Sequence, residues 1–518
     1  MKGWTNMVDT RKRRAAVFLF FLLLLCGVLL FCKHTEKITC MNVEVLSQYE
    51  QDSLGEYVYK DVSRELQFNG HRAAIDLDSS IIYIPQDIRQ NTQMEDLLGR
   101  LQSTSPSLRL SFAPDEAFED LAAAVQDGHL FRLNVAHGFN KYMQYHVAFT
   151  TLPVLRLEGE VIGKNERGKD ICKGTMALWH PMDPDIHSYS IKTSNAQWHV
   201  RGGFSATLLK TPFKLNLKNS TGTGKSVALA GLGSDDDWIL NPMNLDDTKL
   251  KETLFMELWN QRAEQVDWNQ KMSKGEYVEV VINGEYWGLF QLQRRIDRKL
   301  LELGGEDVLL KSGADLDAPT IQSAYEIIHS TLTEEETYGL MQGFYDKKDP
   351  DILNMDNFLD TNLFLQSAAA VDNMIKNMFF LLQKNDDDYQ LSFLPWDTDM
   401  SWGTLWKAEA GGFAYDFEQS RQNYAVRIES EWIQKFYPDL QQQMAQRWFE
   451  LRENLLTMEN VTAILEQEQQ LLDASGAQSR DTDRWGLFYK GADSLENLYR
   501  SVEARFAWVD EYYGQNLQ

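Results

Sequence analysis

Four polar residues in the second half of the chain, Asp372, Asn377, Asp397 and Asp399, lie beside strongly apolar segments. An unpaired carboxylate is costly next to apolar packing, so these acids are either solvated or neutralised by a cation. Asp372 and Asn377 have the D-x4-N spacing that joins a base aspartate to a metal-binding asparagine in kinase catalytic loops. Taken alone this spacing is a weak signal. Hard divalent cations prefer such oxygen ligands, so the group is a candidate metal site.

The segment between the two acidic clusters is predicted to be a β-hairpin. Its two apolar runs, MFFLL and LSFLPW, flank the polar sequence QKNDDD, whose aspartates at 386–388 are expected to form a solvated turn. The hairpin would bring Asp397 back towards Asp372 and Asn377. The tryptophans at positions 396, 402 and 406 are interpreted as core packing.

Other familiar catalytic patterns are absent from the sequence or incomplete. The stretch TGTGKS at 221–226 has Asn219 where the phosphate-binding loop pattern requires glycine, so we interpret it as a turn. The chain has no HExxH pair and no GxSxG elbow. Zinc hydrolases and serine hydrolases are therefore disfavoured.

The charge distribution limits the possible partners. The 518-residue chain has a formal charge of −25, yet residues 1–32 contain five basic residues and one acidic residue. The remaining 46 basic and 75 acidic residues leave a net charge of −29. Such a chain repels nucleic acid, and it would attract a basic protein or a divalent cation.

An uncharged run of 18 residues, 15–32, follows the basic sequence RKRR. This length reaches the lower limit for a transmembrane helix, and the flanking charge places the N-terminus in the cytoplasm. A cleaved signal peptide is the alternative, but the run is long and no small-x-small site follows it. Outside the run, Cys40 and Cys172 are permitted to form a disulfide, which the sequence does not establish.

The order of segments predicts an α+β fold, because strands are followed by a helix, further strands and then helices with an embedded hairpin. Asn283-Gly284 between two alternating runs is a strong second hairpin signal. The predicted organisation is a cytoplasmic tail (1–14), a transmembrane signal anchor (15–32), a stalk (33–60), a β-rich module (61–190) and a main domain with a helical C-terminal part (191–518).

Four blocks together resemble the CotH kinase family, atypical kinases named for a bacterial spore-coat protein. They are HVRGGFSATLLKTPFKLNLK, EYVEVVINGEYWGLFQLQRRIDRKLL, DNMIKN and FLPWDTDMSWG, and they span about 195–405. The resemblance implies a divergent protein-kinase-like domain that transfers the γ-phosphoryl group of ATP to Ser or Thr, with Mg²⁺ or Mn²⁺. It implies that Asp372 is the catalytic base and that Asn377 and Asp397 bind metal, with Asp399 as the alternative to Asp397.

The same resemblance suggests the nucleotide-binding residues. Lys214 or Lys210 would contact phosphate, and alternation does not choose between them. Arg201 in the RGG block is assigned to the nucleotide, and Glu257 is a weaker candidate to pair with the lysine. The chain departs from the family at Arg294, where many members have an acidic residue. This departure leaves nucleotide affinity, nucleotide choice or activity in doubt.

The sequence therefore predicts an outward-facing kinase, anchored in the cell membrane by one helix, that acts on basic Ser/Thr-containing envelope or coat proteins. A catalytically silent scaffold for surface assembly is the main alternative, since ATP is scarce outside the cell. A carbohydrate-acting enzyme with paired acids is a third possibility, but no spacing specifies it.

Overall fold

A computed structural model of the chain describes residues 44–86, 101–114, 120–138, 140–313, 320–346, 351–374, 376–386, 388–407, 412–416 and 437–515. No helix within these ranges is long and apolar enough to cross a membrane. The predicted span at 15–32 lies outside the described residues, as does Cys40, so the anchor and the disulfide stay predictions. Cys172 is a free cysteine among the described residues. The chain divides into two compact units, the smaller containing Met1–Arg72, Gln93–Ala117 and Leu133–Gln144.

The smaller unit confirms that the N-terminal part is β-rich. Its elements are β1 (Glu44–Val45), α2 (Gln48–Asp52), β2 (Glu56–Tyr57), β3 (Leu66–Phe68), β4 (His71–Arg72), β7 (Leu101–Ser103), β8 (Leu108–Phe112) and parts of β9 (Phe131–His137) and β10 (Lys141–Thr150). Strand β8 lies between β1 and β9, and β3 lies between β4 and β7. The predicted stalk thus contains three short regular elements, β1, α2 and β2, and β1 pairs with β8.

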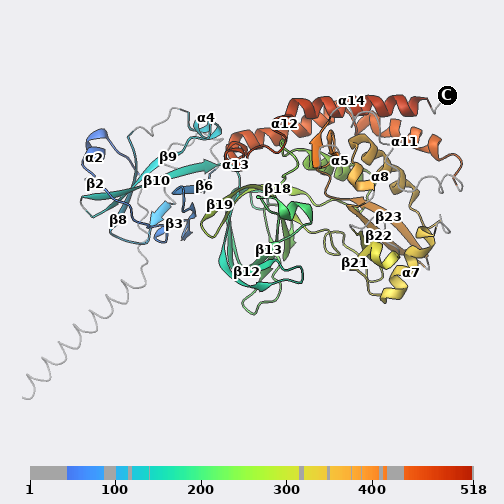
Figure 1. The fold of residues 1–518 in the computed structure, drawn as a ribbon, viewed down its shortest axis with the longest axis horizontal. Helices are drawn as coiled ribbons and strands as arrows, with labels where there is room; N and C mark the ends of the chain where they lie inside the picture. Colours follow the sequence, from blue (N-terminus) through green and yellow to red (C-terminus); the bar gives the residue numbers. More distant parts are fainter. Residues whose placement is uncertain are drawn as a thin grey trace, which may run out of the picture. The chain divides into compact units, whose positions relative to one another are not determined.

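The larger unit contains a closed β-barrel (Figure 1). Its strands in barrel order are β11 (Val154–Lys164), β12 (Asp170–Asp183), β13 (Ser188–Val200), β14 (Phe213–Lys218), β17 (Asp237–Asn241), β19 (Glu285–Arg294) and β18 (Gly275–Ile282). Alternate side chains such as Leu215 and Leu217 fill the core. Asn283 and Gly284 both have positive φ, which confirms the predicted hairpin between β18 and β19. Strand β13 runs across the predicted domain boundary at residue 190.

A second sheet has the order β21 (Tyr325–His329), β20 (Val308–Ser312), β22 (Met378–Asn385) and β23 (Asp388–Pro395). The β22–β23 pairing from Met378 opposite Pro395 to Asn385 opposite Asp388 confirms the predicted hairpin. Helix α8 packs on β23, and α11 and α14 pack on α8 (Figure 1). The main helices are α5 (Lys251–Gln265), α7 (Glu334–Tyr345), α8 (Met355–Ala368), α11 (Leu440–Asn454), α12 (Met458–Ser475), α13 (Ala477–Trp485) and α14 (Leu495–Gly514).

Short elements complete the unit. They are β5 (Ala74–Asp76), β6 (Ile81–Pro85), α4 (Leu121–Gln126), η1 (Phe204–Thr207), β15 (Val227–Ala228), β16 (Ser234–Asp235), α6 (Ile321–Ala324), η2 (Val371–Met374), β24 (Thr404–Lys407) and β25 (Gly412–Tyr415). The mixture of barrel, second sheet and helices confirms a mixed α and β fold.

Candidate active site

The β22–β23 hairpin brings together the two acidic clusters that the sequence separates. Asn377 donates from Nδ2 to Oδ2 of Asp372 over 2.8 Å, and the same nitrogen lies 3.5 Å from the carbonyl oxygen of Asp397. The backbone N–H of Trp396 donates to the carbonyl of Asn377 over 3.1 Å. Asn373 donates to the carbonyls of both Asn377 and Trp396, over 2.9 and 2.8 Å. The two ends of the hairpin are therefore joined by hydrogen bonds at the predicted site.

Two of the predicted site residues have left-handed backbones. The φ angle is 58° at Asn377 and 57° at Asp397. Asparagine and aspartate tolerate this region better than most residues, although a left-handed non-glycine residue costs on the order of 1–3 kcal/mol. Such conformations persist where the surrounding structure holds them, and they are common at functional sites.

A third carboxyl group, Glu252 in the first turn of α5, belongs to the same electrostatic cluster as Asp397 and Asp399. Burial raises the pKa of Glu252 to about 8, and the charge of Asp397 adds to this shift. Burial likewise raises the pKa of Asp397, and it raises the pKa of Asp399 well above its ordinary value with a further contribution from Asp397. Glu252 accepts a hydrogen bond from Asn241 over 2.6 Å. The sequence alone does not identify Glu252, because only the folded chain brings α5 to the hairpin.

The chemistry of these donors fits a hard divalent cation. The pKa values of these carboxyl groups are raised by burial and by one another's charge, and a bound cation would make the groups easier to ionise. In the described part of the chain, however, no group of three or more histidine, cysteine, aspartate or glutamate side chains is arranged to hold a metal ion. The fit therefore rests on the donor chemistry of Asn377, Asp397 and Asp399.

Two cations lie beside the Trp396 ring, and both interact electrostatically with Asp397. The Arg201 guanidinium lies 5.5 Å from the indole centroid, and the Lys311 ammonium lies 4.0 Å from a ring centroid of the same residue. Burial lowers the pKa of Lys311 to about 8, whereas Asp397 opposes the shift. Burial also lowers the pKa of Arg201, again opposed chiefly by Asp397. Lys311, near the end of β20, lies outside the recognised blocks, and no motif in the sequence marks it as a site residue.

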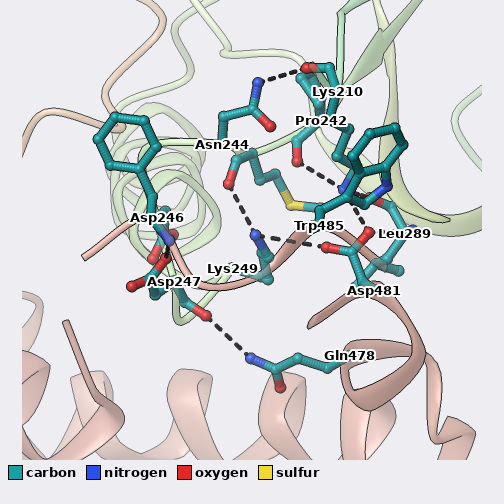
Figure 2. Close-up of polar contacts among 12 residues, drawn as sticks. Lys210, Pro242, Asn244, Asp246, Asp247, Lys249, Leu289, Gln478, Asp481 and Trp485 are labelled. Carbon is teal, nitrogen blue, oxygen red and sulfur yellow. Dashed lines mark hydrogen bonds and ion pairs between the residues drawn. The ribbon is translucent and has the colours of Figure 1, made fainter. Parts of the chain in front are cut away.

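The two lysines that the sequence predicts to contact phosphate form ion pairs with aspartates in the structure. Lys214 pairs with Asp237 over 3.0 Å on the adjacent strand β17. Lys210 is buried and pairs with Asp481 of α13 over 2.7 Å; its ammonium also donates to the carbonyls of Pro242 and Leu289 (Figure 2).

Glu257, predicted to pair with one of these lysines, instead lies 3.5 Å from Lys274. The structure thus gathers Asp372, Asn377, Asp397, Asp399 and Arg201, whereas Lys210 and Glu257 have other partners.

The departure at Arg294 has a structural explanation. Arg294 donates from Nε and Nη2 to the buried Asp235 carboxylate, over 3.2 and 3.1 Å. The preceding residue, Gln293, lies on the opposite side of β19, with Nε2 3.5 Å from the Glu252 carboxylate. Gln293, not Arg294, is therefore the β19 side chain that borders the carboxyl cluster.

The fold and site define a mixed α and β protein in which one hairpin brings a carboxylate cluster close to two cations, Arg201 and Lys311. The family model of the CotH kinase protein matches residues 198–511, more than half of the chain. The chain therefore belongs to the CotH kinase family and is a kinase-like protein. No curated protein matches it.

Proposed function

We propose that the protein is a metal-dependent protein kinase that transfers the γ-phosphoryl group of ATP to Ser or Thr hydroxyls. The observation that carries the proposal is the hydrogen-bonded Asp372–Asn377 pair beside Asp397, with Arg201 and Lys311 against the neighbouring Trp396 ring. Carboxylates and cations gathered at one place are what phosphoryl transfer requires, because its catalysis is mainly positioning and charge stabilisation.

Each residue has a proposed role. Asp372 orients the acceptor hydroxyl and accepts its proton, and its carboxylate is held in place by Asn377. Asn377 and Asp397, with Asp399 as the alternative, hold Mg²⁺ or Mn²⁺, which when bound neutralises phosphate charge. Arg201 and Lys311 contact phosphate oxygens through their N–H groups.

The proposed setting is the outer face of the cell membrane, with the chain anchored through residues 15–32. The proposed acceptors are basic Ser/Thr-containing envelope or coat proteins, since opposite charge favours encounter with residues 33–518, whose net charge is −29.

The test uses full-length protein in detergent with Mg²⁺ or Mn²⁺, γ-labelled ATP and a basic serine-rich acceptor protein. We expect label on Ser or Thr of the acceptor and a rise in melting temperature when ATP and metal are both present. A folded protein that shows neither effect would favour the silent scaffold.

Lys311→Met is expected to raise the Kd for ATP about tenfold or more, because a hydrogen bond to a charged group contributes about 1.5–3 kcal/mol. The pKa of Lys311 is lowered to about 8, so its charge is present below this pH and is lost as the pH rises through it. ATP affinity of the wild type should therefore fall between about pH 7 and 9.

Calorimetric titration checks both expectations, and Lys311→Arg is the matched control. Arginine stays charged throughout this range, so Lys311→Arg should bind ATP with little dependence on pH. Lys214→Met tests the lysine predicted from sequence: a larger loss of affinity for this variant than for Lys311→Met would assign the phosphate contact to Lys214.

A further inference from the structure

A fully buried lysine begins the helix that carries Glu252. The side chains of Lys251 and Asp493 are both 0% exposed, and Nζ of Lys251 lies 2.7 Å from Oδ1 of Asp493. Lys251 also donates to Oγ1 of Thr404 over 2.7 Å. The rings of Tyr415 and Tyr489 lie 5.3 and 6.0 Å from its ammonium. Lys251 therefore contacts three parts of the chain that are distant from it in sequence: Tyr489 and Asp493, Tyr415, and Thr404.

The C-terminal segment 478–493 also binds the residues immediately before α5. The carboxylate of Asp247 accepts hydrogen bonds from the backbone N–H groups of Phe488 and Tyr489, over 2.7 and 2.8 Å. The N–H of Asp247 in turn donates to Oδ2 of Asp493 over 3.0 Å. Gln478 donates to the carbonyl of Asp247 over 3.2 Å, a contact drawn in Figure 2. The start of α5 is thus held by the C-terminal segment on its backbone as well as through Lys251.

The segment that contains Thr404 connects to the acidic residues of the site. Thr404 begins β24 a few residues after Asp399, and its N–H donates to the carbonyl of Ser401 over 3.1 Å. Glu252 follows Lys251 directly in α5. The charge of Asp399 contributes to the raised pKa of Tyr489, after the larger effect of burial. Lys251 therefore joins the chain segments that carry Glu252 and Asp399.

We propose that Lys251 and Asp493 are positioning residues. Their ion pair holds the segments that carry Glu252 and Asp399 in a fixed relative position, so that the C-terminal segment completes the candidate active site. The functional part of this inference rests on the proposed function. Two buried charges seldom stabilise a fold more than apolar residues of the same size. Partners that orient ligand side chains commonly change metal affinity by about 10–100-fold when removed.

The test compares Asp493→Asn with Glu279→Gln in the full-length protein. Glu279 is the matched control because it is a fully buried carboxylate that pairs with another C-terminal residue, Arg480, over 2.8 Å. Mn²⁺ binding is followed by electron paramagnetic resonance, and backbone order by amide hydrogen exchange without nucleotide. We expect Asp493→Asn to weaken Mn²⁺ binding about tenfold and to speed exchange at 250–256 and 399–404. Glu279→Gln should lower the melting temperature without either effect.

Wild-type Mn²⁺ affinity in folded Asp493→Asn protein, or equal effects of the two variants, would overturn the inference. If Asp493→Asn does not fold, Thr404→Val removes only the hydroxyl that accepts from Lys251 and is expected to weaken Mn²⁺ binding in the same direction; unchanged affinity would overturn the inference. Faster exchange at both segments in a protein that binds no Mn²⁺ and transfers no phosphate would support the positioning role and overturn the proposed function.

Discussion

The Asp397→Asn variant is expected to lose phosphoryl transfer by about 10²–10³-fold, the usual effect of removing one group that stabilises charge in a transition state. Asp397 interacts with most of the other site residues. Its carbonyl oxygen lies near the Asn377 amide, and its carboxylate changes the pKa values of Arg201, Lys311 and Glu252. The substitution keeps the size of the side chain but removes the charge that both cations face. Initial rates with labelled ATP at saturating metal measure the effect.

Asp388→Asn is the matched control for this experiment. It makes the same chemical change in the same hairpin, but Asp388 is exposed at the turn, opposite Asn385. Activity of Asp388→Asn should equal that of the wild type. Full activity in Asp397→Asn combined with a large loss in Asp399→Asn would transfer the proposed role to Asp399, and full activity in both would refute the site.

Local signals predicted the central part of the site from sequence. The hairpin between Asn377 and Asp397 follows from two apolar runs around a polar turn, and pairing of its strands necessarily brings its two ends together. Asn283-Gly284 was equally predictable, because few other residues adopt the positive φ that its turn requires. These predictions needed no knowledge of how distant segments pack.

Residues contributed by distant elements could not be found in this way. Glu252 and Lys311 belong to α5 and β20, and nothing in their own sequence neighbourhoods marks them as neighbours of Asp397. Strand alternation separates Gln293 from Arg294, but only the tertiary structure shows which of the two borders Glu252. The same limit applies to Lys210. This residue belongs to a recognised block, but its partner in the structure, Asp481, lies in α13.

The Asp481→Asn variant is expected to lower the free energy of unfolding by about 3–5 kcal/mol, because it leaves a buried lysine without its counter-charge. Asp481 accepts from the N–H of Leu289 over 2.9 Å, pairs with Lys210, and lies 3.8 Å from Lys249 (Figure 2). Burial already lowers the pKa of Lys210 to about 8, and Asp481 is the main influence that opposes this shift. Urea denaturation measures the loss.

Asp170→Asn provides the surface control for this prediction. Asp170 pairs with Lys164 over 2.7 Å at an exposed site, where such a pair contributes about 0–1 kcal/mol. A loss in Asp481→Asn no larger than in this control would contradict the structural role. The Lys210→Met, Asp481→Leu double variant removes both charges of this pair and should recover part of the stability, because the Leu289 N–H and Lys249 still lose their carboxylate partner. If that folded variant binds ATP as the wild type does, Lys210 is a structural residue. If ATP binding is lost, Lys210 contacts the nucleotide, as the sequence predicts.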